Sequence, residues 1–457
     1  MYYSRKLEIF KSIVAQLQNK YERVAFSNGT LFFFSLLMKK LKNIFKKIGP
    51  GFITGASDDD PSGITTYSQT GAQFGFTQLW TALFSFPFML FVQEMCGRIG
   101  LVSGMGLSGV IRKHYSRKLL AFSVILLVVA NTINIGADLG AMASALQLLL
   151  PLPFPVLLLL LTAFTLFLEV FVSYKAYVKY LKYFALSLLA YIITLFFIKQ
   201  DWGAIAYATF VPHFSFSKEY LLNIVAILGT TISPYLFFWQ TDEEVEEEIV
   251  EHKIKGFGIG KPHIGDRDVK NMRFDTLFGM FFSNLIMFFI IATAGSTLFA
   301  HGITNIETAA DAAEALRPLA GNFTFILFTV GIIGTGLLAV PVLAGSASYA
   351  VAEAFNWKEG LYRKFSQAHG FYGVITIATL VGLLINFIGV PPFKMLYYTA
   401  VVNGLLAPPL LFVILRVANN KKVLGKYTNS VWSNIFGGAI AIIMSIAGIA
   451  LLYQLFV

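Results

Sequence analysis

Apolar runs of about twenty residues, each long enough to cross a bilayer core as one helix, recur along this chain and constrain its fold more than any other feature. Only 13% of the 457 residues are charged, which is too few to cover the surface of a water-soluble domain. We therefore predict an all-α polytopic membrane protein with eleven spans. The predicted spans lie near residues 49–73, 78–100, 119–148, 153–173, 181–199, 220–240, 275–300, 319–345, 368–389, 393–416 and 431–456.

Lys and Arg residues gather before the first predicted span and in the turns after the second, fourth, eighth and tenth spans. The alternate turns hold few of them: 148–153 has none, and 301–318 has only Arg317. Because positive charge marks the cytoplasmic side, we predict a multi-pass protein of the cell membrane with a cytoplasmic N-terminus and an extracellular C-terminus. This topology explains the net charge of +10, so no nucleic-acid partner is required.

The segment before the first span is basic and contains one short apolar run, "TLFFFSLLM" at residues 30–38. This run is too short to cross a bilayer and leads directly into lysines. We predict that residues 1–47 form a cytoplasmic segment with an amphipathic helix on the inner leaflet. Residues 48–457 would then form the transmembrane domain.

The sequence offers little support for an enzyme. Its single cysteine, Cys96, excludes an internal disulfide and a cysteine-based metal site. The P-loop, H-E-x-x-H and G-x-S-x-G motifs do not occur in it. We therefore predict no enzymatic activity, no catalytic residues and no bound cofactor.

Glycine and proline interrupt two of the predicted spans. "GASDDDPSG" at 55–63 falls in the first span, and "GTTISPY" at 229–235 falls in the sixth. Both residue types destabilise a helix interior, and proline also removes a backbone donor. Interruptions at corresponding positions of two halves are typical of inverted-repeat transporters with a midplane substrate site. We predict that helices 1 and 6 are broken, and that helices 1–5 and 6–10 form an inverted repeat.

Three consecutive carboxylates stand at the first interruption. Successive helical residues point about 100° apart, so the three cannot all reach one ion from a regular helix. We predict that Asp60 binds a cation directly, that Asp59 faces the aqueous path or binds through water, and that Asp58 caps a helix or contacts another one. The unwound backbone carbonyls of Ser57 and Thr230 would add oxygen ligands.

The segment "GPGFITGASDDDPSGITTYSQTGAQFGFTQLW" at 49–80 resembles the first helix of NRAMP-type divalent metal transporters. The Asp-Pro-Gly-Asn motif of that family falls on residues 60–63 without gaps. "GTTISPY" is similar to the family's sixth-helix motif, "GADLGAM" at 136–142 to its third-helix motif, and "AGSASYAVAEAF" at 344–355 to the loop after helix eight. The resemblance implies a LeuT-like fold of eleven helices with metal bound between helices 1 and 6.

Two departures at the implied metal site resemble the NRAMP-related branch associated with magnesium transport. The family's binding aspartate is kept as Asp60, but its asparagine partner is Gly63 and its methionine ligand is Ser233. Hard cations prefer oxygen ligands, whereas a thioether favours softer transition metals. Gly63 would also enlarge the cavity for an ion that keeps several waters. We predict that the transported substrate is Mg²⁺, with Mn²⁺ also accepted.

Other departures concern the family's proton relay. The histidine of the sixth helix is Tyr235, and the third-helix aspartate is kept as Asp138 while the following glutamate is Ala141. Asn403 would lie opposite the metal site in this type of fold. Because a proton route needs a chain of titratable groups, we predict import driven by the membrane potential without proton coupling.

Other functions stay open at this point. A proton-coupled Mn²⁺/Fe²⁺ symporter is the main alternative, followed by a sodium-coupled amino-acid symporter of the same fold. Asp60 disfavours the latter, because a substrate carboxylate would meet a negative charge where it needs a helix N-terminus. A receptor that transports nothing is a further alternative. The partners we expect are a divalent metal ion and the lipid bilayer, and we expect the protein to be a monomer.

Overall fold

The structure is a computed structural model that describes residues 49–172, 186–260 and 262–456. The predicted cytoplasmic segment 1–47 lies outside these residues. In the described part, the only pairing of the β type is an isolated bridge between Gly256 and Ile259. The all-α class predicted from the apolar runs is therefore confirmed.

The first half of the chain contains α3 (Pro50–Asp58), α4 (Pro61–Phe74), α5 (Trp80–Ser103), α6 (Leu107–His114), α7 (Arg117–Gln147), α8 (Phe154–Phe171), α10 (Leu189–Phe197) and α11 (Trp202–Phe210). The second half contains α12 (Lys218–Thr231), α13 (Pro234–Val250), α14 (Asp266–Thr297), α15 (Ala309–Ala313), α16 (Arg317–Ala320), α17 (Thr324–Phe355), α18 (His369–Ile385), α19 (Pro392–Ala418), α20 (Lys421–Leu424) and α21 (Val431–Phe456).

Seven helical segments of the described chain are long and apolar enough to cross a membrane. They are Arg117–Gln147, Phe154–Phe171, Lys218–Val250, Asp266–His301, Ala309–Phe355, Pro392–Ala418 and Val431–Gln454. The other predicted spans also coincide with helices, since α3 with α4, α5, α10 and α18 occupy their positions. Each predicted span thus has a helical counterpart, although part of the fifth lies outside the described residues.

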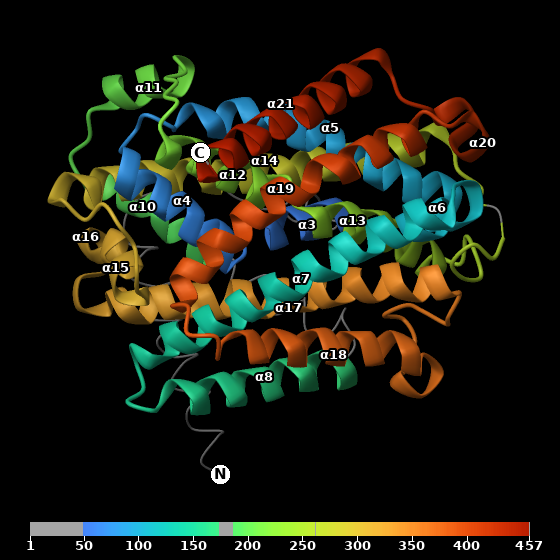
Figure 1. The fold of residues 1–457 in the computed structure, drawn as a ribbon, viewed down its shortest axis with the longest axis horizontal. Helices are drawn as coiled ribbons and strands as arrows, with labels where there is room; N and C mark the ends of the chain where they lie inside the picture. The colour runs from blue at the N-terminus through green and yellow to red at the C-terminus, as the bar shows by residue number, and fades with distance from the viewer. Residues whose placement is uncertain (1–48, 173–185, 261, 457) are drawn as a thin grey trace, which may run out of the picture. The chain divides into compact units, whose positions relative to one another are not determined.

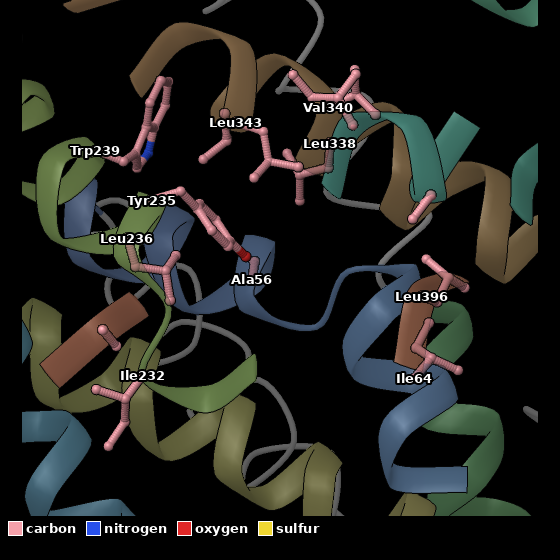
Figure 2. Packing of buried hydrophobic residues seen from close by; sticks show 14 of the residues in the cluster. Ala56, Ile64, Ile232, Tyr235, Leu236, Trp239, Leu338, Val340, Leu343 and Leu396 are labelled. Atoms are coloured by element: carbon pink, nitrogen blue, oxygen red, sulfur yellow. The ribbon is translucent and has the colours of Figure 1, made fainter. Parts of the chain in front are cut away.

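Both predicted breaks are present, and both are built in the same way. A proline begins the second half-helix at Pro61 of α4 and at Pro234 of α13, where its missing N–H costs nothing. Asp60 and Ser233 precede these prolines with extended backbone angles. Figure 2 shows the unwound segment between α3 and α4, with Ala56 before it. The broken first and sixth helices are therefore confirmed.

Large apolar side chains are exposed on helices at the edge of the bundle. Phe164 and Phe167 on α8 are about half exposed, and Ile446 and Ile449 on α21 are still more exposed. A water-soluble protein seldom exposes so many large apolar groups along one helix, whereas lipid tails accept them. These surfaces therefore support the membrane location.

The acidic run after the sixth span is mostly buried, although its charge predicts exposure to solvent. "TDEEVEEEIVEHK" predicts a solvated helix end, because clustered charges usually face water, and a role in collecting cations at the cytoplasmic mouth is the alternative. The structure instead continues α13 to Val250 and buries most of the run, including Asp242 with no exposed surface. The expectation of a solvated end is wrong, because tertiary packing against α5, α6 and α17 covers this part of α13.

Helix α14 packs along both halves of the first broken helix, and α12 packs against α19. Helices α7 and α17 run side by side, with α8 and α18 beyond them in Figure 1. The apolar core lies between these layers and reaches the breaks, where Leu236 and Trp239 of α13 appear together in Figure 2. The breaks are thus enclosed by protein.

Helices α3 and α14 approach so closely that their backbones are in contact. A Cβ atom on Gly55 would lie 2.3 Å from the carbonyl oxygen of Gly279, and one on Gly279 would lie 2.1 Å from that of Gly51. Asp275 on α14 also accepts hydrogen bonds from the N–H groups of Gly49 and Gly51, at 2.9 and 2.7 Å. The first half-helix is therefore fixed to α14 at its N-terminus and along its length.

The Gly55→Ala substitution tests this close approach. Its Cβ would push α3 away from α14, and such overpacking costs about 1–3 kcal/mol. We expect a lower melting temperature for the purified variant in detergent. Gly373→Ala on α18 is the matched control, because no atom lies within 4 Å of the added Cβ and its melting temperature should not fall. Equal melting temperatures for the two variants would contradict the close approach.

Candidate cation site

Asp60 occupies the break between α3 and α4 and is almost fully buried. Its Oδ1 accepts hydrogen bonds from the Ser62 hydroxyl at 2.6 Å and the Gly63 N–H at 2.7 Å, so the carboxylate caps α4. Its Oδ2 accepts a hydrogen bond from Asn134 on α7 at 2.9 Å. A carboxylate offers about four lone-pair positions, so these three donors leave room for one further partner.

Asp58 and Asp59 are fully buried and poorly compensated. The Ser283 hydroxyl of α14 lies 2.5 Å from Asp58 Oδ2 and 3.4 Å from Asp59 Oδ1. A hydroxyl has one hydrogen to donate, so the shorter contact with Asp58 takes it. Among the described residues, Asp58 Oδ1 and Asp59 Oδ2 have no hydrogen-bond partner. The predicted contact of Asp58 with another helix is present.

The three carboxylates together form a centre of unbalanced negative charge. None of them makes an ion pair with a Lys or Arg of the described chain. A buried charge without a partner is costly, so such a group binds a cation or takes up a proton. Because Asp58 bonds to α14 while Asp60 bonds to α4 and α7, their carboxylates diverge, as predicted for three successive residues.

The second break contributes oxygen atoms that already have partners. The Tyr235 hydroxyl donates a hydrogen bond to the Ser57 carbonyl at 2.9 Å, which ties α13 to the end of α3. Figure 2 shows this ring reaching from α13 toward the end of α3. The Ser233 hydroxyl lies 2.6 Å from the Gly229 carbonyl oxygen and 2.8 Å from that of Thr230, so its one hydrogen is shared between them. A carbonyl oxygen has two lone pairs, so both predicted carbonyl ligands can bind an ion while they keep these contacts.

Gly63 lies where the two broken helices meet. A Cβ atom on it would lie 3.0 Å from the Asp58 carbonyl oxygen and 3.5 Å from Thr230 Oγ1. The same Thr230 oxygen lies 3.5 Å from the Ser62 hydroxyl. The space beside Gly63 is therefore narrow in this conformation, whereas its missing side chain predicts a wide cavity.

Asp138 on α7 is fully buried, and neither of its oxygens has a hydrogen-bond partner in the described part of the chain. Asp138 and Asp60 lie close enough to interact electrostatically with each other and with Tyr235. Asp138 thus belongs to the same acidic region. The predicted residue Asn403 is buried on α19, next to Gly404, where α19 touches α12 at Gly229.

A cavity of about 220 Å³ lies between α4, α12 and α19, beyond the breaks. Thr65, two residues after Gly63, is among its lining residues. Gln69 borders the same cavity and binds the backbone of Thr304 and Ile306, at 3.2 and 2.8 Å. The cavity therefore runs along α4 as far as Thr65, close to the first break.

Three polar residues at the site escape prediction from the sequence. Ser62 and Asn134 bind Asp60, and Ser283 binds Asp58. Ser62 lies within the motif at 60–63, so its position could have signalled a role. Asn134 and Ser283 are 74 and 225 residues away from their partners, and no local pattern connects them.

The described residues contain no group of three His, Cys, Asp or Glu side chains arranged to hold a metal ion. A cation between the breaks would therefore combine few carboxylates with carbonyl oxygens, hydroxyls and water. Such oxygen-rich, partly hydrated surroundings suit a hard divalent ion. The fold and these buried carboxylates define a membrane transporter, and not an enzyme.

Comparison with known proteins agrees with this class. Residues 51–454 match the family model of natural resistance-associated macrophage protein-like (Nramp) proteins. The chain therefore belongs to the Nramp family. It is 24% identical to the divalent metal cation transporter MntH of Caldanaerobacter subterraneus subsp. tengcongensis, covering 91% of this chain and 94% of that one. It is also 24% identical to the MntH of Clostridium acetobutylicum, with 92% and 94% covered.

Solved structures support the fold. The Eremococcus coleocola manganese transporter superposes with a TM-score of 0.70 at 16% identity, covering 89% of this chain and 86% of that one. The nucleobase-cation-symport transporter Mhp1 in a closed conformation gives a TM-score of 0.56 at 12% identity, with 89% and 90% covered. The predicted LeuT-like fold is confirmed by these similarities.

Proposed function

We propose that this chain imports divalent metal ions across the cell membrane by alternating access, with Mg²⁺ as the preferred ion and Mn²⁺ as a second substrate. The observation that carries the proposal is the group of buried, unbalanced carboxylates at the meeting point of two broken helices. The family relatives named divalent metal cation transporters support the substrate class.

In this proposal Asp60 binds the ion directly at the break. Asp59 faces the aqueous path or binds the ion through water, while Asp58 keeps its hydrogen bond from Ser283 on α14. The carbonyl oxygens of Ser57 and Thr230 add ligands through their second lone pairs, beside the hydroxyl groups that already contact them. Ordered waters complete the coordination, because Mg²⁺ dehydrates reluctantly.

The preference for Mg²⁺ rests on the oxygen-only chemistry of the site. Ser233 offers a hydroxyl at the start of α13, and Gly63 adds no side chain, so neither position selects a soft metal. The 220 Å³ cavity beside α4 would then serve as the outer access path. In this proposal the opposite end of the bundle, where the basic turns gather, faces the cytoplasm.

The proposed driving force is the membrane potential alone. A divalent ion moving inward gains about 4.6 kcal/mol per 100 mV, twice the value for a single charge. With Tyr235 and Ala141 in place of the family's histidine and glutamate, a chain of proton carriers is hard to build. One observation favours the alternative of a proton-coupled Mn²⁺/Fe²⁺ symporter: Asp138 is buried beside the site with both oxygens unpartnered within the described residues.

Competitive uptake into proteoliposomes separates these two functions. Mg²⁺ and Mn²⁺ are offered together under an inside-negative potential while the internal pH is recorded. We expect Mg²⁺ flux without internal acidification. Strong Mn²⁺ preference with acidification would favour the symporter, and no metal flux above protein-free liposomes would refute metal transport.

A further inference from the structure

Asp242 lies on α13, eight residues after the proline that begins this half-helix. It has no exposed surface, and neither carboxylate oxygen has a hydrogen-bond partner in the described chain. About 13 Å of helix axis separates it from Ser233 at the break, at 1.5 Å per residue. This carboxylate therefore lies well away from the central site and needs a partner of its own.

The carboxylate of Asp242 points at the start of α6. A Cβ atom on Gly106 would lie 1.8 Å from Asp242 Oδ1 and 2.5 Å from Glu353 Oε2, so these two oxygens are close neighbours. Glu353, near the end of α17, is also buried. Its two oxygens accept hydrogen bonds from the N–H groups of Gly106 and Gly109, both at 2.7 Å. The backbone N–H groups at the start of α6 therefore donate to Glu353, and Asp242 receives no hydrogen bond from them.

The charged groups around Asp242 do not neutralise the charge of its carboxylate. The strongest ones acting on it belong to four acidic residues, Glu353, Glu359, Glu243 and Glu246. Arg112 on α6 acts on Glu353 and Glu359 and so balances part of this charge. Two buried carboxylates from different helices consequently face one small space, and one of them has no donor.

We propose that Asp242 and Glu353 form a second divalent-cation site, separate from the one at the helix breaks. One or two carboxylates with several waters are the usual protein ligands of Mg²⁺, so two side chains suffice. An ion there would join α13 to α17 and to the start of α6. By the charge pattern of the turns this is the cytoplasmic end, where the site senses or receives the ion that the proposed function delivers.

The test counts Mn²⁺ ions bound to the purified full-length chain in detergent, by electron paramagnetic resonance of the free ion. We expect Asp242→Asn to lose one bound ion and Asp60→Asn to lose a different one, so that the double variant binds none. Glu251→Gln removes an exposed carboxylate from the following turn and should keep the full number. Gly106→Ala, whose Cβ would displace Asp242 Oδ1, should lose the same ion as Asp242→Asn.

The outcomes separate this site from the central one. If Asp242→Asn and Gly106→Ala both bind as many ions as the unmodified chain, the second site does not exist and the two carboxylates share a proton instead. If Asp60→Asn alone keeps the full number, the central site fails and the second site stands. Thermal unfolding provides an independent readout, because Mn²⁺ should raise the melting temperature of Asp60→Asn but not that of the double variant.

Discussion

Asp60→Ala is expected to reduce divalent metal uptake to the level of protein-free liposomes. The substitution removes the carboxylate at the break and also the cap of α4, and loss of a cap alone costs about 1 kcal/mol. The expected readout is Mg²⁺ or Mn²⁺ flux into proteoliposomes containing equal amounts of folded protein.

A matched variant separates the charge from the cap. Asp60→Asn keeps an oxygen that can accept hydrogen bonds from Ser62 and Gly63, but it carries no charge. We expect Asp60→Asn to be as inactive as Asp60→Ala while unfolding at nearly the same temperature as the unmodified chain. Asp311→Asn, at a partly exposed position where the carboxylate also caps its own helix, α15, is the control for charge removal. Transport by Asp60→Asn at the normal rate would limit Asp60 to a structural role.

Ser233→Met should shift the selectivity of transport toward Mn²⁺. A thioether at the start of α13 would bind Mn²⁺ better than Mg²⁺, since sulfur favours softer metals. We expect the ratio of Mn²⁺ to Mg²⁺ uptake to rise by about tenfold, which corresponds to about 1.4 kcal/mol. Competitive uptake from an equimolar mixture measures that ratio directly.

The control for sulfur is Ser233→Leu. Both substitutions remove the hydroxyl that binds the carbonyls of Gly229 and Thr230, and both add comparable bulk to a buried position. The difference between them therefore reports the thioether. Equal selectivity ratios in the two variants would show that residue 233 does not contact the ion.

The fold could be predicted in detail where local chemistry decides it. Apolar runs locate the spans, and the prolines at 61 and 234 locate both breaks, because each acts through its own backbone. The run at 241–251 could not be predicted in the same way. Its charge indicates solvent exposure, but helices distant in sequence cover it. Packing of that kind leaves no trace in the local pattern.

The site residues also fall into those that the local sequence predicts and those that depend on distant parts of the chain. The position of Asp60 at the break and the contact of Asp58 with another helix follow from the sequence, whereas their partners Asn134 and Ser283 do not. The hydrogen bond from the Tyr235 hydroxyl to the Ser57 carbonyl could not be predicted either, because it depends on how two half-helices meet. The assignment of metal ligands stays a prediction that the Asp60 and Ser233 variants test.

The attachment of α3 to α14 determines how the bundle can rearrange. The Asp275 carboxylate accepts hydrogen bonds from the N–H groups of Gly49 and Gly51. Close contacts between glycines of α3 and α14 continue as far as Gly55. A hinge motion of α3 alone would break both bonds and separate two backbones that now touch. Any conformational change that frees the N-terminal end of α3 must therefore either move α14 together with α3 or begin by breaking the hydrogen bonds to Asp275.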